Sequence, residues 1–420
     1  MREMKSSGTP WIGEVPASWS LVRFKDKYQS VKEIAREKSG EFERLALTLN
    51  GVIKRPKDDS EGLQPKEFDT YQILRENDFV FKMIDLQNIS TSRVGLSPYT
   101  GLVSPAYLRF SPKKEGQDNR FVYYYLMSLY YNCVFNNLGG NGVRSALNAT
   151  DMGEFIIPFP SDTEQQQICN YLEKQNKKVD ALIANEQSQI EKLKAYKLSL
   201  ITEVATKGLD RNVPLKDSGV EWIGFIPTTW RIIRVKQLLK ERGERSVDGT
   251  EEPLSMSQKL GLVPTKMLDT IPNMASSFVG AKLTFVDDLV FNKLKAHLGV
   301  FSVSKYDGLV SPDYAVYYST GKVHLKYLEY LFKTPQCISE FRKRSTGIAA
   351  GLTRLYTDGL FAIECPYPTM DEQIAIVNYL NEKCSQIDRL IAVKQTKIEK
   401  LEQYKKSIIY EYVTGKKEVL

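Results

Sequence analysis

Two long segments of this chain repeat one another and limit what it can fold into. Residues 164–206 and 372–414 align without a gap at a constant offset, as between Asn170 and Asn378, and about half of their positions are identical. A gapless match of this length indicates an internal duplication. Neither segment contains proline or glycine, and Gly208 or Gly415 follows where a helix would stop. The sequence therefore predicts two helices of about 40 residues, each ~60 Å long.

Apolar residues recur in alternating steps of four and three along both segments, which is typical of a coiled coil. The positions that we expect to pair the helices, and to support partner binding, are Val179, Ile183, Ile190, Leu193 and Leu200 in the first copy and Ile387, Ile391, Ile398, Leu401 and Ile408 in the second. Lys197 and Lys405 also fall on this seam, either solvated at its ends or setting the register. A helix this long with one apolar stripe needs a partner helix. Because each copy follows its own domain, we expect the two helices to pair antiparallel around a pseudo-twofold axis.

The duplication extends beyond the helices. WIGEVPASW at residues 11–19 returns as WIGFIPTTW at 222–230, and GLVSP at 101–105 returns at 308–312. Each half predicts a short strand, a second strand, an amphipathic helix, a glycine-bearing loop and a last strand ended by proline. These elements are expected at 79–81, 107–110, 121–135, 139–142 and 156–160, and at 289–291, 314–317, 324–343, 347–351 and 363–368. Strands and helices do not alternate regularly, so we predict α+β domains.

Composition bounds the organisation of the chain and its location. With 420 residues, of which 42% are hydrophobic and 26% charged, the chain can build two domains of ordinary size. It has no run of 18 apolar residues and no apolar segment at its amino terminus, so we expect a soluble, cytoplasmic protein. The net charge of +7 slightly favours anionic partners.

The motifs of catalysis are missing. The sequence has no G-x-x-x-x-G-K-[ST] phosphate loop and no N-P-P-Y or D-P-P-F motif. The Gly139-Gly140-x-Gly142 cluster follows a predicted helix rather than a strand, which favours a turn over a dinucleotide or methyl-donor site. Pro312-Asp313 is not followed by an Asp/Glu-x-Lys motif. The five cysteines include no C-x-x-C pair and only two histidines are present, too few for a zinc site. We therefore expect no catalytic residues, no metal and no cofactor.

The repeated motifs are similar to those of a known family. The W-I-G-x-x-P-x-x-W opening, led by DSGVE at 217–221, resembles the specificity (S) subunits of Type I restriction-modification enzymes. The G-L-V-S-P-x-Y motif and the P-x-x-x-E-Q junction at 160–165 are also similar, and the resemblance covers both halves. NKLKAHLG at 292–299 looks like the family's basic segment after a strand, whereas KMIDL at 82–86 matches it poorly.

The resemblance implies a fold and a function. Two target recognition domains, here 1–161 and 209–369, would alternate with two conserved helical regions, here 162–208 and 370–420. The chain would be a non-catalytic subunit whose partners are double-stranded DNA, methyltransferase (M) subunits on the helical spine and a restriction (R) subunit. Because the two domains have diverged, the DNA target should be bipartite and asymmetric.

Two other functions remain open at this point. A coiled-coil scaffold whose end domains bind proteins should lack salt-dependent DNA affinity. A single-chain nuclease should cleave DNA without partners when a metal is supplied.

DNA contacts are expected from basic and amide residues of the two domains, because arginine can bind guanine edges and lysine can bind phosphate. The candidates are Arg93, Arg109, Asn141 and Arg144 in the first domain and Lys293, Lys295, Arg344 and Arg354 in the second. The tyrosines at 123–125 and 130–131 have helical spacing, which favours core packing over base stacking.

Overall fold

The computed structural model describes residues 2–49, 51–59, 67–86, 88, 91, 93–138, 146–258, 260–270, 277–349 and 352–419. The chain forms two compact units. Unit 1 comprises Met1–Glu186 and Thr396–Leu420, and unit 2 comprises Gln187–Gln395. Each unit thus combines one globular α+β part with one stretch of each long helix. The division into four sequence segments stays a prediction about functional parts, since compactness groups the residues differently.

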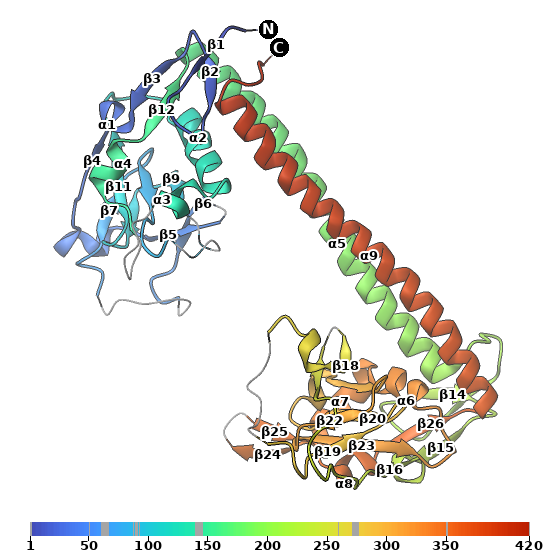
Figure 1. Cartoon of the computed structure of the whole chain (residues 1–420). Helices are drawn as coiled ribbons and strands as arrows, with labels where there is room; N and C mark the ends of the chain where they lie inside the picture. The colour runs from blue at the N-terminus through green and yellow to red at the C-terminus, as the bar shows by residue number, and fades with distance from the viewer. Residues whose placement is uncertain are drawn as a thin grey trace. The chain divides into compact units, whose positions relative to one another are not determined.

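The two predicted long helices are continuous (Figure 1). Helix α5 spans Asp162–Lys207 and helix α9 spans Met370–Val413. Gly208 and Gly415 follow them with φ values of +80° and +69°, a left-handed conformation that ends a helix and that glycine adopts without strain. All ten seam positions named above are buried or half-buried. Within the described part of the chain, no helix has both the length and the apolar character needed to cross a membrane.

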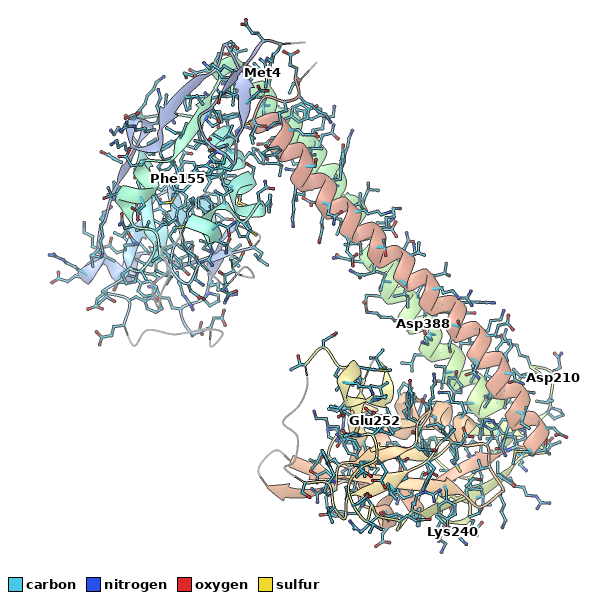
Figure 2. All side chains as sticks on the ribbon, in the orientation of Figure 1. Met4, Phe155, Asp210, Lys240, Glu252 and Asp388 are labelled. Atoms are coloured by element: carbon cyan, nitrogen blue, oxygen red, sulfur yellow. The ribbon has the colours of Figure 1, made fainter. Side chains whose placement is uncertain are left out.

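Ion pairs between the helices confirm the antiparallel arrangement within each unit. In unit 1, Lys405 Nζ lies 2.7 Å from Asp180 Oδ1. In unit 2, Lys197 Nζ lies 2.6 Å from Asp388 Oδ2, and Figure 2 labels this aspartate on α9. Lys197 corresponds to Lys405, and Asp180 to Asp388, in the alignment of the two copies. The same pair therefore forms twice with the roles of the helices exchanged, as the predicted pseudo-twofold repeat requires.

A second related set of contacts differs between the units. In unit 1, Lys397 Nζ donates to Glu186 Oε1 at 2.6 Å, and in unit 2, Lys394 Nζ donates to Gln189 Oε1 at 2.5 Å. Glu186 aligns with Lys394 and Gln189 with Lys397. The geometry of the pair is kept while its charges change, so the repeat is not exact at this level of the coiled coil.

The described residues of unit 1 form two four-stranded sheets and two strand pairs. One sheet is antiparallel in the order β4-β11-β8-β9, formed by Tyr28–Ser30, Leu108–Pro112, Phe79–Phe81 and Val94–Leu96. The other has the order β6-β5-β10-β7, formed by Gly51–Arg55, Arg44–Thr48, Gly101–Val103 and Gln72–Leu74. The pairs are β1-β2, Met4–Ser6 with Glu14–Pro16, and β3-β12, Ser20–Arg23 with Ile156–Phe159. Short helices are α1 Phe24–Lys27, η1 Arg36–Glu41, α2 Arg120–Tyr131, α3 Val134–Leu138 and α4 Ala149–Gly153.

Unit 2 repeats this plan. Its four-stranded antiparallel sheet has the order β16-β23-β20-β21, formed by Leu239–Glu241, Tyr314–Ser319, Leu289–Asn292 and Phe301–Val303. Further pairs are β17-β18 (Leu254–Ser257, Gly261–Pro264), β19-β22 (Lys282–Thr284, Gly308–Val310), β13-β14 (Leu215–Asp217, Phe225–Pro227), β15-β26 (Arg231–Arg234, Glu364–Tyr367) and β24-β25 (Thr346–Ala349, Leu352–Arg354). Helices are η2 Val235–Gln237, η3 Thr265–Met267, η4 Ala296–Leu298, α6 Leu325–Phe332, α7 Pro335–Arg344 and α8 Thr357–Phe361.

The two amphipathic helices predicted at 121–135 and 324–343 are each broken in two. In unit 1 the break follows α2, where Cys133 has a φ of +55° that helical residues do not adopt. In unit 2 the Thr334 side chain accepts a hydrogen bond from the Cys337 amide, and Pro335 occupies the first turn of α7. Such a cap and proline begin a new helix. The apolar periodicity continues across both breaks, and this is why the sequence suggested single helices.

The motif tryptophans attach each globular part to the coiled coil. Trp19 Nε1 donates to Glu164 Oε2 at 2.9 Å in unit 1, and Trp230 Nε1 donates to Glu372 Oε1 at 3.1 Å in unit 2. Both tryptophans are buried. The W-I-G-x-x-P-x-x-W motif and the glutamate of the junction motif thus recur together because they form one contact at the start of each long helix.

Candidate nucleic-acid interface

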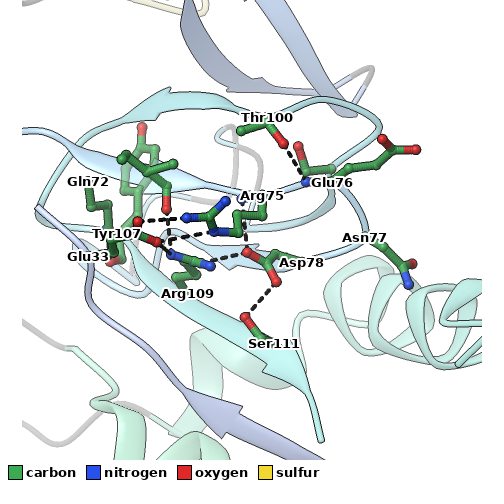
Figure 3. Close-up of polar contacts among 12 residues, drawn as sticks. Glu33, Gln72, Arg75, Glu76, Asn77, Asp78, Thr100, Tyr107, Arg109 and Ser111 are labelled. Carbon is green, nitrogen blue, oxygen red and sulfur yellow. Dashed lines mark hydrogen bonds and ion pairs between the residues drawn. The ribbon is translucent and has the colours of Figure 1, made fainter. Parts of the chain in front are cut away.

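Arg109, predicted to contact DNA, is a buried structural residue of unit 1. Its side chain is 3% exposed. Nε donates to Asp78 Oδ2 at 2.5 Å, and Nη1 donates to Ile73 O at 2.6 Å and to Glu33 Oε2 at 3.2 Å (Figure 3). These contacts assign the guanidinium a structural role, because it satisfies a buried carboxylate. The DNA contact of Arg109 stays a prediction.

In unit 2 the equivalent buried carboxylate, Asp288, is also bound by an arginine, but this arginine comes from a neighbouring strand. Asp288, at the equivalent turn before β20, is bound by Arg242 through Nε at 2.6 Å and Nη2 at 2.7 Å. The Arg242 amide donates to Val316 O, just as the Val31 amide donates to Arg109 O. Arg242 therefore occupies the place of Val31, and Val316 occupies the place of Arg109. The arginine has moved from one strand to the next while the ion pair is kept.

Arg93 is also buried, with 0% of its surface exposed. Its guanidinium donates to four backbone carbonyls of the loop that follows β8. These belong to Lys82, Ile84, Asp85 and Asn88, at 3.1, 2.7, 2.6 and 2.6 Å. Arg93 therefore holds this loop together, and its DNA contact stays a prediction. Asn141 and Arg144 lie outside the described residues.

Two predicted residues of unit 2, Lys293 and Arg354, lie beside one turn at residues 311–314. Arg354 Nη2 lies 2.7 Å from Asp313 Oδ1. Lys293 Nζ donates to Pro312 O at 3.2 Å, and its backbone amide donates to Asp313 O at 3.2 Å. Lys282, which sequence reasoning did not single out, donates from Nζ to the carbonyl at position 314 at 2.9 Å. The sheet thus gathers three cations at this turn, where Asp313 pairs with Arg354 and Glu241 lies 3.7 Å from Lys282 Nζ.

The charges of this cluster are not balanced. Partial burial lowers the pKa of Lys293, and the nearby cations Lys282 and Arg354 lower it further, while the carboxylates Glu241 and Asp313 oppose the shift. A lysine whose charge is disfavoured by neighbouring cations would gain from a bound anion. The cluster can therefore accept a phosphate or another electronegative group.

The other two predicted residues of unit 2, Lys295 and Arg344, are exposed. Arg344 ends α7 and stands directly before the antiparallel ribbon β24-β25 (Figure 1), in which Thr346 pairs with Arg354. A glycine-bearing loop was expected here, and a two-stranded ribbon is found instead. A ribbon of this kind fits the major groove of B-DNA. Arg344 and Arg354 flank its base.

Unit 1 lacks this charged cluster at the same place in the fold. The equivalences follow from matching backbone hydrogen bonds, such as Leu147 N to Met83 O and Leu355 N to Lys293 O, both at 3.0 Å, and from the strand registers. In unit 1 the positions of Lys293, Arg354, Asp313 and Lys282 are held by Met83, Ala146, Ala106 and Gln72. The aspartate stands at the variable position of the repeated S-P-x-Y motif, and this difference between the copies was the signal that could have identified it.

The described residues hold no group of three or more His, Cys, Asp or Glu side chains arranged to bind a metal ion. Burial raises the pKa of the Cys169 and Cys365 thiols to about 12. Thiols that resist ionisation are poor nucleophiles.

Comparison with known proteins agrees with this picture. Residues 30–192 match the Type I restriction modification DNA specificity domain. The chain is 23% identical over 425 residues to the Type I restriction enzyme MjaVIII specificity subunit of Methanocaldococcus jannaschii, covering 96% of this chain and 93% of that one. A solved chain from work on complex assembly and conformational transition of the type I R-M system superposes with a TM-score of 0.67 at 13% identity, covering 95% of this chain and 98% of the other. In its family model, its sequence relatives and its fold, the chain is similar to the specificity subunits of Type I restriction-modification enzymes.

Proposed function

We propose that the chain is the non-catalytic, DNA-binding subunit of a cytoplasmic Type I restriction-modification complex. The globular part of each unit contacts one half of a bipartite, asymmetric double-stranded DNA target. Catalysis comes from partner subunits, a methyltransferase and a restriction subunit, and the chain itself uses no cofactor.

The observation that carries the proposal is the contrast between a shared scaffold and a changed surface. The two units have the same strand order around the same buried carboxylate, Asp78 or Asp288. At the exposed turn of the S-P-x-Y motif they present different chemistry, Ala106 in one and Asp313 in the other. Two copies of one scaffold with different surfaces suit two DNA half-sites of different sequence.

The helix pair carries a repeated apolar surface that suits partner docking. Leu182 and Tyr196 of α5 are exposed, and so are the residues aligned with them in α9, Leu390 and Tyr404. Large exposed apolar side chains often mark protein interfaces. Their recurrence at equivalent positions supports the binding of two copies of one partner, and we assign this role to the methyltransferase subunits.

Methylation mapping tests the DNA part of the proposal. The chain is co-expressed with its methyltransferase, and the methylated sequences are determined by single-molecule sequencing. We expect two different half-sites separated by base pairs of any sequence. A continuous palindrome, or the absence of sequence preference, would contradict the proposal.

Copurification tests the docking surface. Replacing Leu182 and Leu390 by Ser should abolish copurification of the methyltransferase and leave the thermal stability of the chain unchanged. The matched control replaces Glu191 and Glu399, which are also exposed and also aligned with each other, by Ala. Loss of the partner in the control, or its retention in the leucine variant, would argue against the assigned surface.

A further inference from the structure

Asp313 is an exposed carboxylate inside a cationic cluster. Its side chain is 49% exposed, and its only described ion pair is with Arg354, which is 25% exposed. A pair with this much solvent access contributes about 0–1 kcal/mol to stability. Unit 1 folds into the same sheet with Ala106 and Ala146 at the equivalent positions. The fold therefore does not need the pair.

The partial hydrogen bonding of Arg354 supports the same conclusion. Its Nη2 is engaged by Asp313, but its Nε is buried and has no hydrogen-bond partner among the described residues. A buried donor without a partner is costly. Arg354 thus keeps one donor that the described residues do not satisfy, while its guanidinium carbon lies 5.8 Å from the centroid of the Tyr356 ring.

The sign of the charge narrows what Asp313 can contact. A surface that only holds the DNA backbone gains nothing from a carboxylate, because phosphate repels it. In the major groove, the groups that favour a carboxylate are the exocyclic amines, N4 of cytosine and N6 of adenine. The neighbouring Lys293 and Lys282 can offset the negative potential of the phosphates on either side.

We propose that Asp313 is a specificity-determining residue that accepts a hydrogen bond from the exocyclic amine of a cytosine or adenine in the half-site of unit 2. Arg354 is a positioning residue that orients the carboxylate. Unit 1, with Ala106 at this turn, makes no such contact. This inference rests on the proposed function and adds the chemical class of the base that is read.

The test is methylation mapping of complexes that contain Asp313→Ala or Asp313→Asn, with the methyltransferase present. We expect one position of the unit 2 half-site to lose its preference by roughly tenfold or more, the size of one direct base contact. The unit 1 half-site should not change. The matched control is Glu364→Gln, since Glu364 also forms an exposed ion pair with an arginine of unit 2, Arg234. The control should leave the whole target unchanged.

Two further variants distinguish a direct base contact from a general electrostatic effect on DNA affinity. Arg354→Lys keeps the charge but loses the planar fork, and it should relax the same base position as Asp313→Ala. Lys293→Met, which reproduces the residue of unit 1, should weaken binding to all sequences alike and leave the preferred bases unchanged. Fluorescence anisotropy with the mapped target and with single-base substitutions measures both effects on the intact complex.

The outcomes distinguish this inference from the proposed function. An unchanged motif in a folded Asp313→Ala variant overturns the inference and leaves the DNA-binding role standing. Tighter binding to every sequence with no change of motif also overturns it, because the carboxylate then acts only through its charge. A wild-type complex without any sequence preference contradicts the proposed function itself.

Discussion

Removing the Arg109 guanidinium should destabilise unit 1 without altering the DNA sequence that is recognised. The variant Arg109→Val introduces the residue found at the equivalent position of unit 2, Val316. Asp78 then loses its Nε donor at 2.5 Å and keeps the hydroxyl of Ser111 at 2.6 Å and the amide of Arg75 at 2.9 Å. The carboxylate remains buried and its charge has no counterion in contact.

The size of the effect follows from the burial of both partners, which are 3% and 4% exposed. Removing one partner of a buried ion pair costs about 3–5 kcal/mol. For a unit of roughly 200 residues, each kcal/mol lowers the melting temperature by about 2–4 °C. We therefore expect the melting temperature of unit 1 to fall by about 6–20 °C.

A second change should restore much of this loss. Val31→Arg places an arginine where Arg242 stands in unit 2, next to the equivalent carboxylate. The double variant Val31→Arg with Arg109→Val should recover at least about half of the lost free energy, since it rebuilds a charge-assisted pair. Scanning calorimetry and urea titration of the intact chain measure the stability, and methylation mapping at a permissive temperature measures the target. The reasoning is refuted if the double variant is no more stable than Arg109→Val, or if Arg109→Val changes the motif without losing stability.

Further predictions concern the other parts of the chain. Burial raises the pKa of Glu329, but the charges of Lys333 and Lys326 lower it by more, so the pKa lies below its ordinary value of 4.5. Its stabilising effect is therefore present above pH ~4.5 and lost as the pH falls through the lower folded value, so Glu329→Gln should show a smaller loss of unit 2 stability in acid urea titrations than the wild type. Ile190→Asp combined with Ile398→Asp buries unpaired charge on the seam, and gel filtration and copurification should show loss of helix pairing and of methyltransferase binding; survival of the complex would exclude the spine as the docking site. Because the pKa of Lys293 is lowered from 10.5, DNA affinity should weaken as the pH rises toward that value, and an identical pH profile for Lys293→Met would exclude this residue as the cause. Lengthening both long helices equally should change the spacing between half-sites in the mapped motif, and a change in the bases themselves would contradict the modular design.

The sequence by itself determined the coiled coil and the repeated fold. Helices predicted to span 164–206 and 372–414 are observed as Asp162–Lys207 and Met370–Val413. Apolar periodicity, the absence of proline and glycine, and a glycine at each end are local properties, so they can be recognised without the fold. Three strands of each half were also predicted, and they are observed as β8, β11 and β12 and as β20, β23 and β26.

Only the tertiary structure decided which basic residues face solvent. The sequence gives no sign that Arg93 and Arg109 differ from Lys293 and Arg354 in exposure. In the structure, however, Arg93 is buried and binds backbone carbonyls, and Arg109 is buried and binds Asp78. Burial of an arginine depends on the carboxylates and carbonyls that neighbouring strands bring to it, and these come from distant parts of the chain.

The tertiary structure likewise assembled the cluster around Asp313. Lys282, Lys293 and Arg354 come from three separate segments, and sheet pairing brings them to one turn. The sequence marked two of these cations as candidates but could not show that both lie at the turn that carries Asp313. Strand register decides which side chains become neighbours, and register is set by the packing of the whole sheet rather than by any local pattern.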